Sequence, residues 1–331
     1  MGTKRRAILF TTSGRSAPLI KLFRKRLNPR GYRILAADAS PLAPSLHVAD
    51  RGFVVPGIND AGYCDEILNI CFRNNVEAVV PLNEADQAAL LKRRSAFPAF
   101  TTVLASDVET IETCDDKIRF FEALRGTGLN LPATGTGDSP PPFRSKWIVK
   151  PRAGGGASRN IILLHSPDEL WKRHRTPGFV VQDFVEGTEY TVDTFSDLDG
   201  NPVIAVPRER ISVRHGQSDK GRTLHDETLS RLAMLTVRTL RIVGPANTQF
   251  ICSPDGACHL IETNPRFSGG IALTAASLPD LPDVLLRVVQ RREIPGELTR
   301  FREILMVRHD SEIWLKEQDG KLAPFDPGSG V

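Results

Sequence analysis

The stretch HLIETNPRFSGG, residues 259–270, places several chemically capable side chains at the end of an apolar segment. Alternate residues of a β-strand point to the same face, so Glu262 and Asn264 share one face. The preceding segment NTQFICSPDGAC alternates in the same manner, and SPDGA has the composition of a hairpin turn. A hairpin loop of two or four residues would place Gln249 opposite Glu262, whereas a three-residue Pro-Asp-Gly loop with a bulge would break that register.

The same register would place Asn247 opposite Asn264 and gather oxygen ligands on one face. One carboxylate with neutral amides suits Mg²⁺ that carries nucleotide phosphates, whereas zinc would favour Cys or His. Arg266 follows and can neutralise phosphate oxygens, and the Ser-Gly-Gly that comes next offers backbone N–H groups before a short helical segment. An ordinary hairpin with a polar tip is the alternative, but it would not need Asn-Pro-Arg after a buried strand.

A second segment, WIVKPRAGGGASRN, joins an apolar strand to a glycine run. Lys150 at the end of the strand is costly to bury without a partner, and a phosphate would supply one. Glycines 154–156 allow the backbone to lie close over an anion. The spacing is not that of a Walker P-loop, because the lysine precedes the glycines. The glycine run alone is weak evidence, and the metal hairpin strengthens it.

A third segment, VVQDFVEGTEYTVD, is an extended apolar run interrupted by Glu186 and Gly187. Its backbone groups at residues 183–185 can face an adenine edge, and Glu189 can reach ribose hydroxyls. The alternative is a strand bend with acids that face solvent.

These segments require elements that position them. Residues 1–112 alternate short apolar runs with helical periodicity, which predicts a parallel sheet with helices on both faces and an α/β fold. Polar residues after one of its strands, among them Asn83 and Asp86, either line a cleft or cap the next helix. A capped helix is expected after Cys114, then a turn-rich connector over 135–143 and β-rich segments. The polar stretch 208–227 is expected to be a loop between a strand and a helix.

The composition is that of an ordinary globular protein, with 331 residues and a net charge of +4. The basic clusters are short and far apart, so we expect no nucleic-acid partner. No segment approaches the length of a membrane span, so no membrane partner is expected. The five cysteines are scattered without a CxxC spacing, which favours reduced thiols in a cytoplasmic protein.

In this order and spacing, the three segments resemble the ATP-grasp superfamily, especially single-domain relatives of the carbamoyl-phosphate synthetase large subunit. The resemblance covers most of the chain, and it includes the parallel-sheet domain that precedes the nucleotide module. It implies a Rossmann-like pre-ATP-grasp domain over 1–112, a small lobe over 113–185, a large lobe with the metal hairpin over 186–300, and a C-terminal strand and tail over 301–331.

The resemblance also implies roles for individual residues. Lys117 and Lys150 correspond to the lysines that touch the ATP phosphates. Arg210 resembles the basic residue at the reacting centre, with Arg208 as a close competitor, and Arg266 resembles the arginine that steadies the transferred phosphate. The family usually has Glu where Asp183 stands. The flap is assigned to Gly154, Gly155, Gly156 and Ser158, the adenine hinge to Gln182, Asp183, Phe184 and Val185, the ribose contact to Glu189, and the Mg²⁺ site, which would also accept Mn²⁺, to Gln249, Glu262 and Asn264.

The implied reaction is ATP-dependent activation of a small carboxylate, such as an amino acid, as an acyl phosphate, which an amine or ammonia then attacks. The chain has one ATP-grasp half, no internal repeat and no glutaminase-like segment, so a complete carbamoyl-phosphate synthetase is not expected. Alternatives are a partner-dependent subunit of that type, a non-catalytic ATP-binding regulator and a kinase. A homodimer through the parallel-sheet domain is a further expectation. The arginines at 208, 210, 214 and 222 would suit an acidic substrate, a phosphate clamp or a solvated surface equally.

Overall fold

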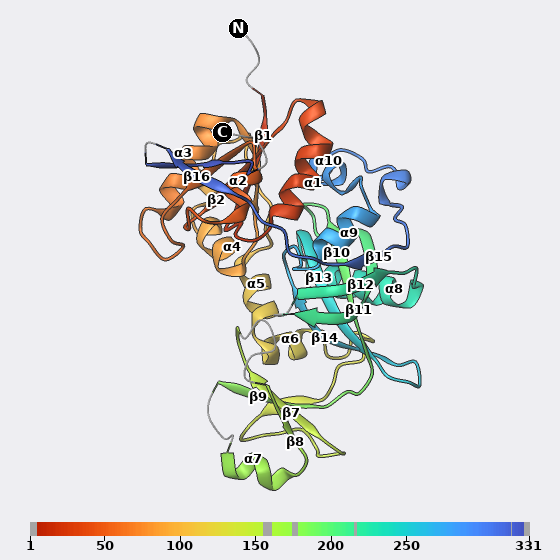
Figure 1. The fold of residues 1–331 in the computed structure, drawn as a ribbon. Coiled ribbons are helices and arrows are strands. Elements are labelled where there is room, and N and C mark those ends of the chain that lie inside the picture. Colours follow the sequence, from red (N-terminus) through yellow and green to blue (C-terminus); the bar gives the residue numbers. More distant parts are fainter. Residues whose placement is uncertain (1–4, 155–160, 174–177, 215–216, 319, 328–331) are drawn as a thin grey trace. The chain divides into compact units, whose positions relative to one another are not determined.

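The computed structural model describes residues 5–154, 161–173, 178–214, 217–318 and 320–327 (Figure 1). The chain divides into two compact units. Within the described ranges, none of the helices combines the length and the apolar character that crossing a bilayer requires. Unit 1 contains Met1–Ala105, Leu278–Arg300 and Val307–Val331, and unit 2 contains Ser106–Ser277 and Phe301–Met306.

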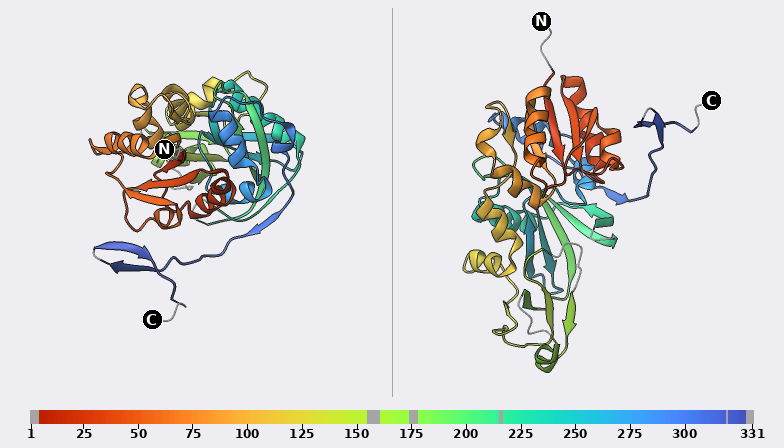
Figure 2. Two further views of the ribbon diagram at one scale, coloured as in Figure 1. Left: turned by 90° about the horizontal axis from the view of Figure 1, so that it is seen from above. Right: turned by 90° about the vertical axis from the view of Figure 1, so that its left-hand side faces the viewer.

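Unit 1 is built around a five-stranded parallel sheet, as the alternation of strands and helices predicts. The central strand is the apolar run AILFT, and all five of its residues are buried. The strands of this sheet lie side by side in the red to orange part of the chain in Figure 2. In the order β3-β2-β1-β4-β5 the strands are β1 (Ala7–Thr11), β2 (Arg33–Asp38), β3 (Arg51–Val54), β4 (Val76–Pro81) and β5 (Thr102–Val103).

The helices of unit 1 bury apolar faces against this sheet. Tyr63, Ile67 and Ile70, spaced by four and three residues, pack with strand residues in one core cluster. Residues 278–300, which the resemblance places in the large lobe, group with unit 1 by their contacts in the structure, where Asp283 contacts Arg26. The helices are α1 (Ala17–Leu27), η1 (Asn28–Arg30), α2 (Pro44–Val48), α3 (Tyr63–Asn74), α4 (Glu84–Leu91), η2 (Arg94–Ala96), α10 (Leu281–Val289) and η3 (Gly296–Thr299), and a hairpin of β16 (Leu315–Gln318) and β17 (Lys321–Pro324) ends the unit.

Polar residues at the carboxyl ends of β1 and β4 bind one another. Asp86 is fully buried and accepts hydrogen bonds from Thr11 (2.6 Å), Thr12 (3.0 Å) and Tyr63. Burial raises the pKa of the Asp86 carboxyl. The Asn83 side chain accepts a hydrogen bond of 2.8 Å from the Ala85 N–H at the start of α4, so Asn83 is a helix cap. Of the two interpretations of this loop, a cleft lining and a helix cap, the structure supports the helix cap.

Unit 2 contains two antiparallel sheets. The smaller sheet has the order β6-β9-β7-β8 and the larger has the order β14-β13-β10-β11-β12-β15. The smaller sheet comprises β6 (Thr134–Thr136), β7 (Trp147–Pro151), β8 (Ile162–Leu164) and β9 (Phe179–Asp183), with α7 (Pro167–Arg173). The larger comprises β10 (Thr188–Ser196), β11 (Pro202–Arg214), β12 (Gln217–Thr223), β13 (Gly244–Cys252), β14 (Cys258–Asn264) and β15 (Leu305–Val307).

One face of the larger sheet packs on helices. Val192, Phe250 and Leu260 join the core of α8, whose residues Leu229 and Ala233 are fully buried one turn apart. Asp226 caps α8 by accepting a hydrogen bond of 2.8 Å from the Leu229 N–H. The apolar residues of these alternating strands are therefore buried on this face of the sheet, and the polar residues of the strands occupy the other face. The helices of unit 2 include α5 (Val108–Asp115), α6 (Lys117–Leu124), α8 (Glu227–Thr239) and α9 (Ile271–Ser277).

The expectation of a loop over residues 208–227 is wrong. Strands β11 and β12 pair antiparallel, with Arg208 opposite Thr223 and Arg210 opposite Gly221. The polar composition concealed this part of the strands, because the buried side chains of the stretch from 208 to 223 are those of Arg208, Ser218 and Thr223 and not apolar ones.

Candidate functional site

The polar face of the larger sheet brings together residues from four strands. Gln249 of β13 lies opposite Thr191 of β10 and opposite Glu262 of β14. Thr191 in turn lies opposite Arg208 of β11. Directly opposed residues on neighbouring strands point to the same face, so these side chains share one surface. The strand pairing alone therefore gathers the predicted metal ligands and both candidate arginines.

The predicted hairpin register is confirmed, by a route that the sequence did not reveal. The Ser253 N–H donates to the Ala257 carbonyl (2.9 Å), which leaves a three-residue Pro-Asp-Gly tip. Phe250 lies opposite Leu260 and Gln249 lies opposite Glu262, so Ile261 is the extra residue of a bulge. The odd-length tip alone would have placed Gln249 opposite Ile261. The bulge restores the register that aligns the predicted ligands.

The cysteines of this hairpin differ from the prediction. Cys252 and Cys258 lie opposite each other and form a disulfide. The expectation of reduced thiols is therefore wrong for these two residues. Cys64, Cys71 and Cys114 are not disulfide-bonded, as expected. The two cysteines are six positions apart in the sequence, and the strand pairing of the hairpin brings them together.

The proposed metal ligands lie within a hydrogen-bonded amide and carboxylate group. Asn264 Nδ2 donates to Glu262 Oε1 (3.2 Å) and to Asn247 Oδ1 (3.4 Å). Asn247 Nδ2 donates to the backbone carbonyls of Asn264 (3.4 Å) and Arg266 (3.2 Å). Oxygen donors from one carboxylate and two amides, Gln249 included, fit a hard cation such as Mg²⁺. In the described part of the chain, no group of three or more His, Cys, Asp or Glu residues could hold a metal.

Lys150 is the next-to-last residue of β7, and it is buried, with 6 % of its surface exposed. Burial lowers the pKa of its ammonium to about 8, the Glu262 carboxylate partly opposes this shift, and Lys117 adds to it. Lys150 therefore interacts electrostatically with both Lys117 and the Glu262 carboxylate within unit 2. A buried ammonium with a repelling lysine nearby is favourable for a polyanion such as a triphosphate.

Lys117 is positioned by the start of α6. Asp116 caps this helix, accepting hydrogen bonds from the backbone N–H groups of Ile118 (2.9 Å) and Arg119 (3.1 Å). Lys117 Nζ donates to the Gly154 carbonyl at 3.3 Å, and the Gly154 N–H donates to Asp115 at 2.9 Å. The first glycine of the predicted flap is thus tied to the predicted phosphate lysine. Gly155, Gly156 and Ser158 lie outside the described residues.

The predicted hinge borders a cavity of about 330 Å³. Burial raises the pKa of Asp183, while Arg144 at 3.7 Å acts in the opposite direction. Among the described residues, Asp183 Oδ1 is one of the buried side-chain oxygens with no hydrogen-bond partner. Gln182 does not line the cavity and instead donates to Thr134 Oγ1 at 2.7 Å. The lining includes the hinge residues Asp183, Phe184 and Val185 together with Arg144, Lys146 and His259.

The two candidate arginines of β11 occupy different environments. Arg210 contacts the carboxylate of Glu189 and donates to Gln249 Oε1 at 3.3 Å, so it joins the predicted ribose residue to a predicted metal ligand. Arg208 is 1 % exposed and pairs with Asp193. Asp193 was not among the predicted site residues, although it continues the alternation of Glu189 and Thr191 along β10. Arg266 donates to the Phe267 carbonyl at 3.2 Å within the loop after β14.

Family models match two parts of the chain. Residues 8–105 match the PylC-like N-terminal domain, and residues 175–312 match the family described as ATP-grasp in the biosynthetic pathway with Ter operon. The carbamoyl phosphate synthase large chain of Thermoplasma acidophilum is 24% identical over 280 residues, which cover 75% of this chain and 26% of that protein. The chain thus spans about a quarter of the length of this relative.

Solved structures share the fold. The L-amino acid ligase from Bacillus licheniformis superposes with a TM-score of 0.69 at 18% identity, over 95% of this chain and 83% of that one. The biotin carboxylase in a β,γ-ATP complex from Campylobacter jejuni gives a TM-score of 0.70 at 15% identity, over 89% and 73% of the two chains. At these identities the likeness concerns the fold.

Proposed function

Because the chain has the ATP-grasp fold behind a PylC-like N-terminal domain and resembles carboxylate-amine ligases, we propose that it is an ATP-dependent ligase. Its reaction would join a small carboxylate to an amine or ammonia and release ADP and phosphate. The observation that carries the proposal is the alignment of Gln249, Glu262 and Asn264 on one face, with the buried Lys150 in electrostatic contact with Glu262.

The proposed nucleotide site follows from the groups on this face and at the hinge. Lys117 and Lys150 bind phosphate oxygens, and the hinge at residues 183–185, which lines the cavity, holds adenine through its backbone groups. Glu189 contacts the ribose. Gln249, Glu262 and Asn264 hold Mg²⁺ or Mn²⁺, which supplies charge neutralisation at the phosphates when bound with ATP.

The proposed chemistry has two steps. A carboxylate oxygen of the substrate attacks the γ-phosphorus of ATP, the bond to the β-phosphate oxygen breaks, and an acyl phosphate and ADP result. The nitrogen lone pair of the amine then attacks the acyl carbon, phosphate leaves with the electron pair of the C–O bond, and the nitrogen loses a proton. Lys150 and Arg266 stabilise the charge on the transferred phosphoryl group, and Arg210 faces the reacting carboxylate.

The placement of Arg210 supports its assignment to the reacting centre in preference to Arg208. Arg210 contacts two of the proposed ligand-binding side chains, whereas Arg208 is enclosed by protein groups. The proposed substrates are small molecules, and we propose no nucleic-acid or membrane partner. The proposed assembly is a homodimer.

A partner-dependent synthetase subunit is the second candidate, because the chain spans only 26% of the carbamoyl phosphate synthase large chain that it resembles. A purified chain would then bind ATP and turn over only with its partner. A regulator that binds ATP without turnover and a kinase that releases its phosphorylated product would each behave differently from the ligase in the same assay.

The test is ADP release from Mg-ATP in the presence of pooled amino acids and other small carboxylates, with hydroxylamine as the amine. We expect ADP and an equal amount of hydroxamate, whose mass names the carboxylate. A stable phosphorylated product would indicate a kinase instead. ATP binding without ADP from any pool would contradict a stand-alone ligase and favour the partner-dependent subunit or the regulator.

A further inference from the structure

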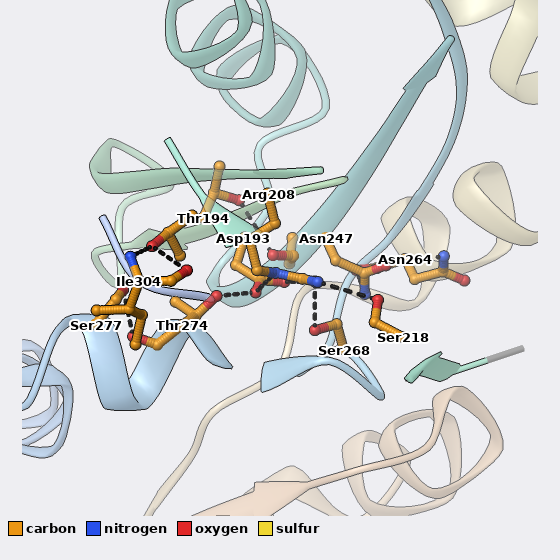
Figure 3. Close-up of polar contacts among 12 residues, drawn as sticks. Asp193, Thr194, Arg208, Ser218, Asn247, Asn264, Ser268, Thr274, Ser277 and Ile304 are labelled. Carbon is orange, nitrogen blue, oxygen red and sulfur yellow. Dashed lines mark hydrogen bonds and ion pairs between the residues drawn. The ribbon is translucent and has the colours of Figure 1, made fainter. Parts of the chain in front are cut away.

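The polar face of the larger sheet contains a buried ion pair that is separate from the proposed phosphate lysines. Arg208 Nε and Nη2 donate to the two carboxylate oxygens of Asp193 at 2.7 and 3.1 Å, a fork geometry in which both hydrogen bonds are charge-assisted (Figure 3). The side chains of Arg208 and Asp193 are 2 % and 4 % exposed. Replacing such a pair with apolar residues is often neutral or stabilising, so stability alone gives little reason for it.

Hydroxyl groups from three other elements converge on this pair. Arg208 Nη2 donates to Ser268 Oγ at 3.1 Å, in the loop between β14 and α9. Arg208 Nη1 donates to Ser218 Oγ of β12 at 3.4 Å, and Thr274 of α9 donates its hydroxyl to Asp193 Oδ2. Figure 3 shows Thr274 beside Asp193 and Ser268 beside the guanidinium of Arg208. The ion pair thus bonds both the loop and the helix that follows it.

The same loop approaches the guanidinium with its backbone. A Cβ atom built on Gly270 would lie 2.5 Å from Arg208 Nη1 and 2.9 Å from Cζ, so a side chain at this position would require the buried guanidinium to shift. Gly270 has no positive φ in this structure, so its glycine is explained by close approach and not by backbone conformation. The segment over residues 268–270 therefore packs directly against the guanidinium of Arg208.

The other end of the loop is held independently. Asn247 Nδ2 donates to the carbonyls of Asn264 and Arg266, and the Arg266 N–H donates to the Asn264 carbonyl at 2.8 Å. The segment that carries Arg266 is thus anchored before the arginine by Asn247 and after it by Arg208. Two anchors leave little freedom for the intervening backbone.

We propose that Arg208 is a positioning residue, which with Asp193 fixes the loop over residues 265–270 so that Arg266 faces the transferred phosphoryl group. The inference about Arg266 rests on the proposed ligase function, whereas the anchoring of the loop does not. On this assignment Arg208 touches no substrate, and the arginines at 208 and 210 have separate tasks. A lysine at position 208 would supply a point charge but not the fork that reaches Asp193 and Ser268 together.

Ser268→Ala tests the anchor while leaving the ion pair intact, and Ser218→Ala is its matched control, since it removes the other hydroxyl on the same guanidinium. In hydrogen–deuterium exchange of the full chain, we expect the amides of residues 267–271 to exchange about tenfold faster in Ser268→Ala, the typical effect of one lost hydrogen bond to a charged group. Ser218→Ala should leave the same amides within about twofold of wild type.

Arg208→Lys is the second variant, with Asp283→Asn of unit 1 as a control for the general effect of disturbing a buried charge. Arg208→Lys should give the same faster exchange, and it should lower kcat about tenfold or more while the KM for ATP changes less than about twofold. Asp283→Asn should change neither the exchange of these amides nor kcat. A raised KM for ATP with unchanged kcat would indicate instead that Arg208 binds nucleotide, and would overturn the proposal.

The two parts of the test separate the inference from the function on which it rests. Unchanged exchange at residues 267–271 in both Ser268→Ala and Arg208→Lys would overturn the anchor, whatever the enzyme does. If the wild-type chain shows no turnover with any substrate pool, the ligase function fails, and the exchange result alone then decides whether Arg208 holds the loop.

Discussion

The guanidinium of Arg210 contacts the carboxylate of Glu189 across the paired strands β10 and β11. The same guanidinium donates to Gln249, so a cation already lies between the proposed ribose residue and a proposed metal ligand. Arg210 is well placed to redistribute its contacts when an anionic substrate arrives.

Glu189→Gln should weaken ATP binding about 10- to 100-fold, because a ribose hydroxyl loses a charged acceptor. The measurement is calorimetric titration with ATP and with 2′-deoxy- and 3′-deoxy-ATP. Wild type should prefer ATP to at least one deoxy analogue, and the variant should lose most of that preference. Glu209→Gln, which removes a pair with Arg222 on the other face, is the control. An undiminished preference in Glu189→Gln would exclude the ribose contact.

The lowered pKa of Lys150 predicts a pH dependence of ATP binding. The ammonium of the free protein loses its proton near pH 8, whereas bound phosphate keeps it charged. ATP affinity should therefore be constant below about pH 7.5 and fall as the pH rises through about 8 to 9.5. Lys150→Met should bind ATP about 10- to 100-fold more weakly at neutral pH and lose this pH dependence. A parallel decline in Lys150→Met would assign the titration to another group.

Lys150 should also lower the stability of the free protein. Its pKa falls from 10.5 to about 8 on folding, so the unfolded chain binds the proton more tightly between these values. The cost is present in full below about pH 8 and disappears as the pH rises toward 10.5. Lys150→Met should therefore raise the melting temperature at pH 7, and the gain should shrink at higher pH. Lys92→Met, at a surface position, should leave the melting temperature unchanged.

Glu262→Gln should abolish Mg²⁺-dependent turnover and leave the fold intact, because it removes a ligand charge and no core packing. ADP release measures the first effect, and circular dichroism with thermal unfolding measures the second. Glu112→Gln, an exposed carboxylate that pairs with Arg119, serves as the reference. A wild-type rate in Glu262→Gln would refute the metal assignment.

Gly270→Ala should lower the free energy of unfolding by about 1 to 3 kcal/mol, the usual cost of overpacking, because the new methyl group would collide with the Arg208 guanidinium. Gly296→Ala is matched to it, since nothing lies within 4 Å of a Cβ there and its φ is ordinary. Urea unfolding of both variants provides the comparison. Equal midpoints in the two variants would mean that the loop does not rest on Arg208.

The local features of the site were predictable because they depend on short-range patterns. Period-2 alternation placed Glu262 and Asn264 on one face, and the turn composition of SPDGA located the hairpin. The cap at Asp116 follows from its position before an amphipathic segment, and the structure confirms it. The strand and helix alternation over residues 1–112 likewise predicted the parallel sheet.

The features that escaped prediction depend on contacts between distant residues. The hydrogen bond from Arg208 to Ser268 spans 60 positions, and nothing near Arg208 in the sequence marks it as buried. A charged residue without a visible partner predicts an exposed loop, so β11 and β12 were missed. The disulfide was missed because Cys252 and Cys258 meet only through the strand pairing of the hairpin.

The bulge at Ile261 acts as a phase correction for the hairpin. It lies between the tip and the polar cluster, so the length of the tip and the pairing of Gln249 with Glu262 are determined at different places in the hairpin. A segment grafted into Pro254–Gly256 would leave the cluster aligned, provided that the strands below the tip still pair. A regular ladder that continued from the tip without the bulge would instead place Ile261 opposite Gln249 and turn Glu262 to the apolar face of the sheet, which would erase the cluster without changing any of its members.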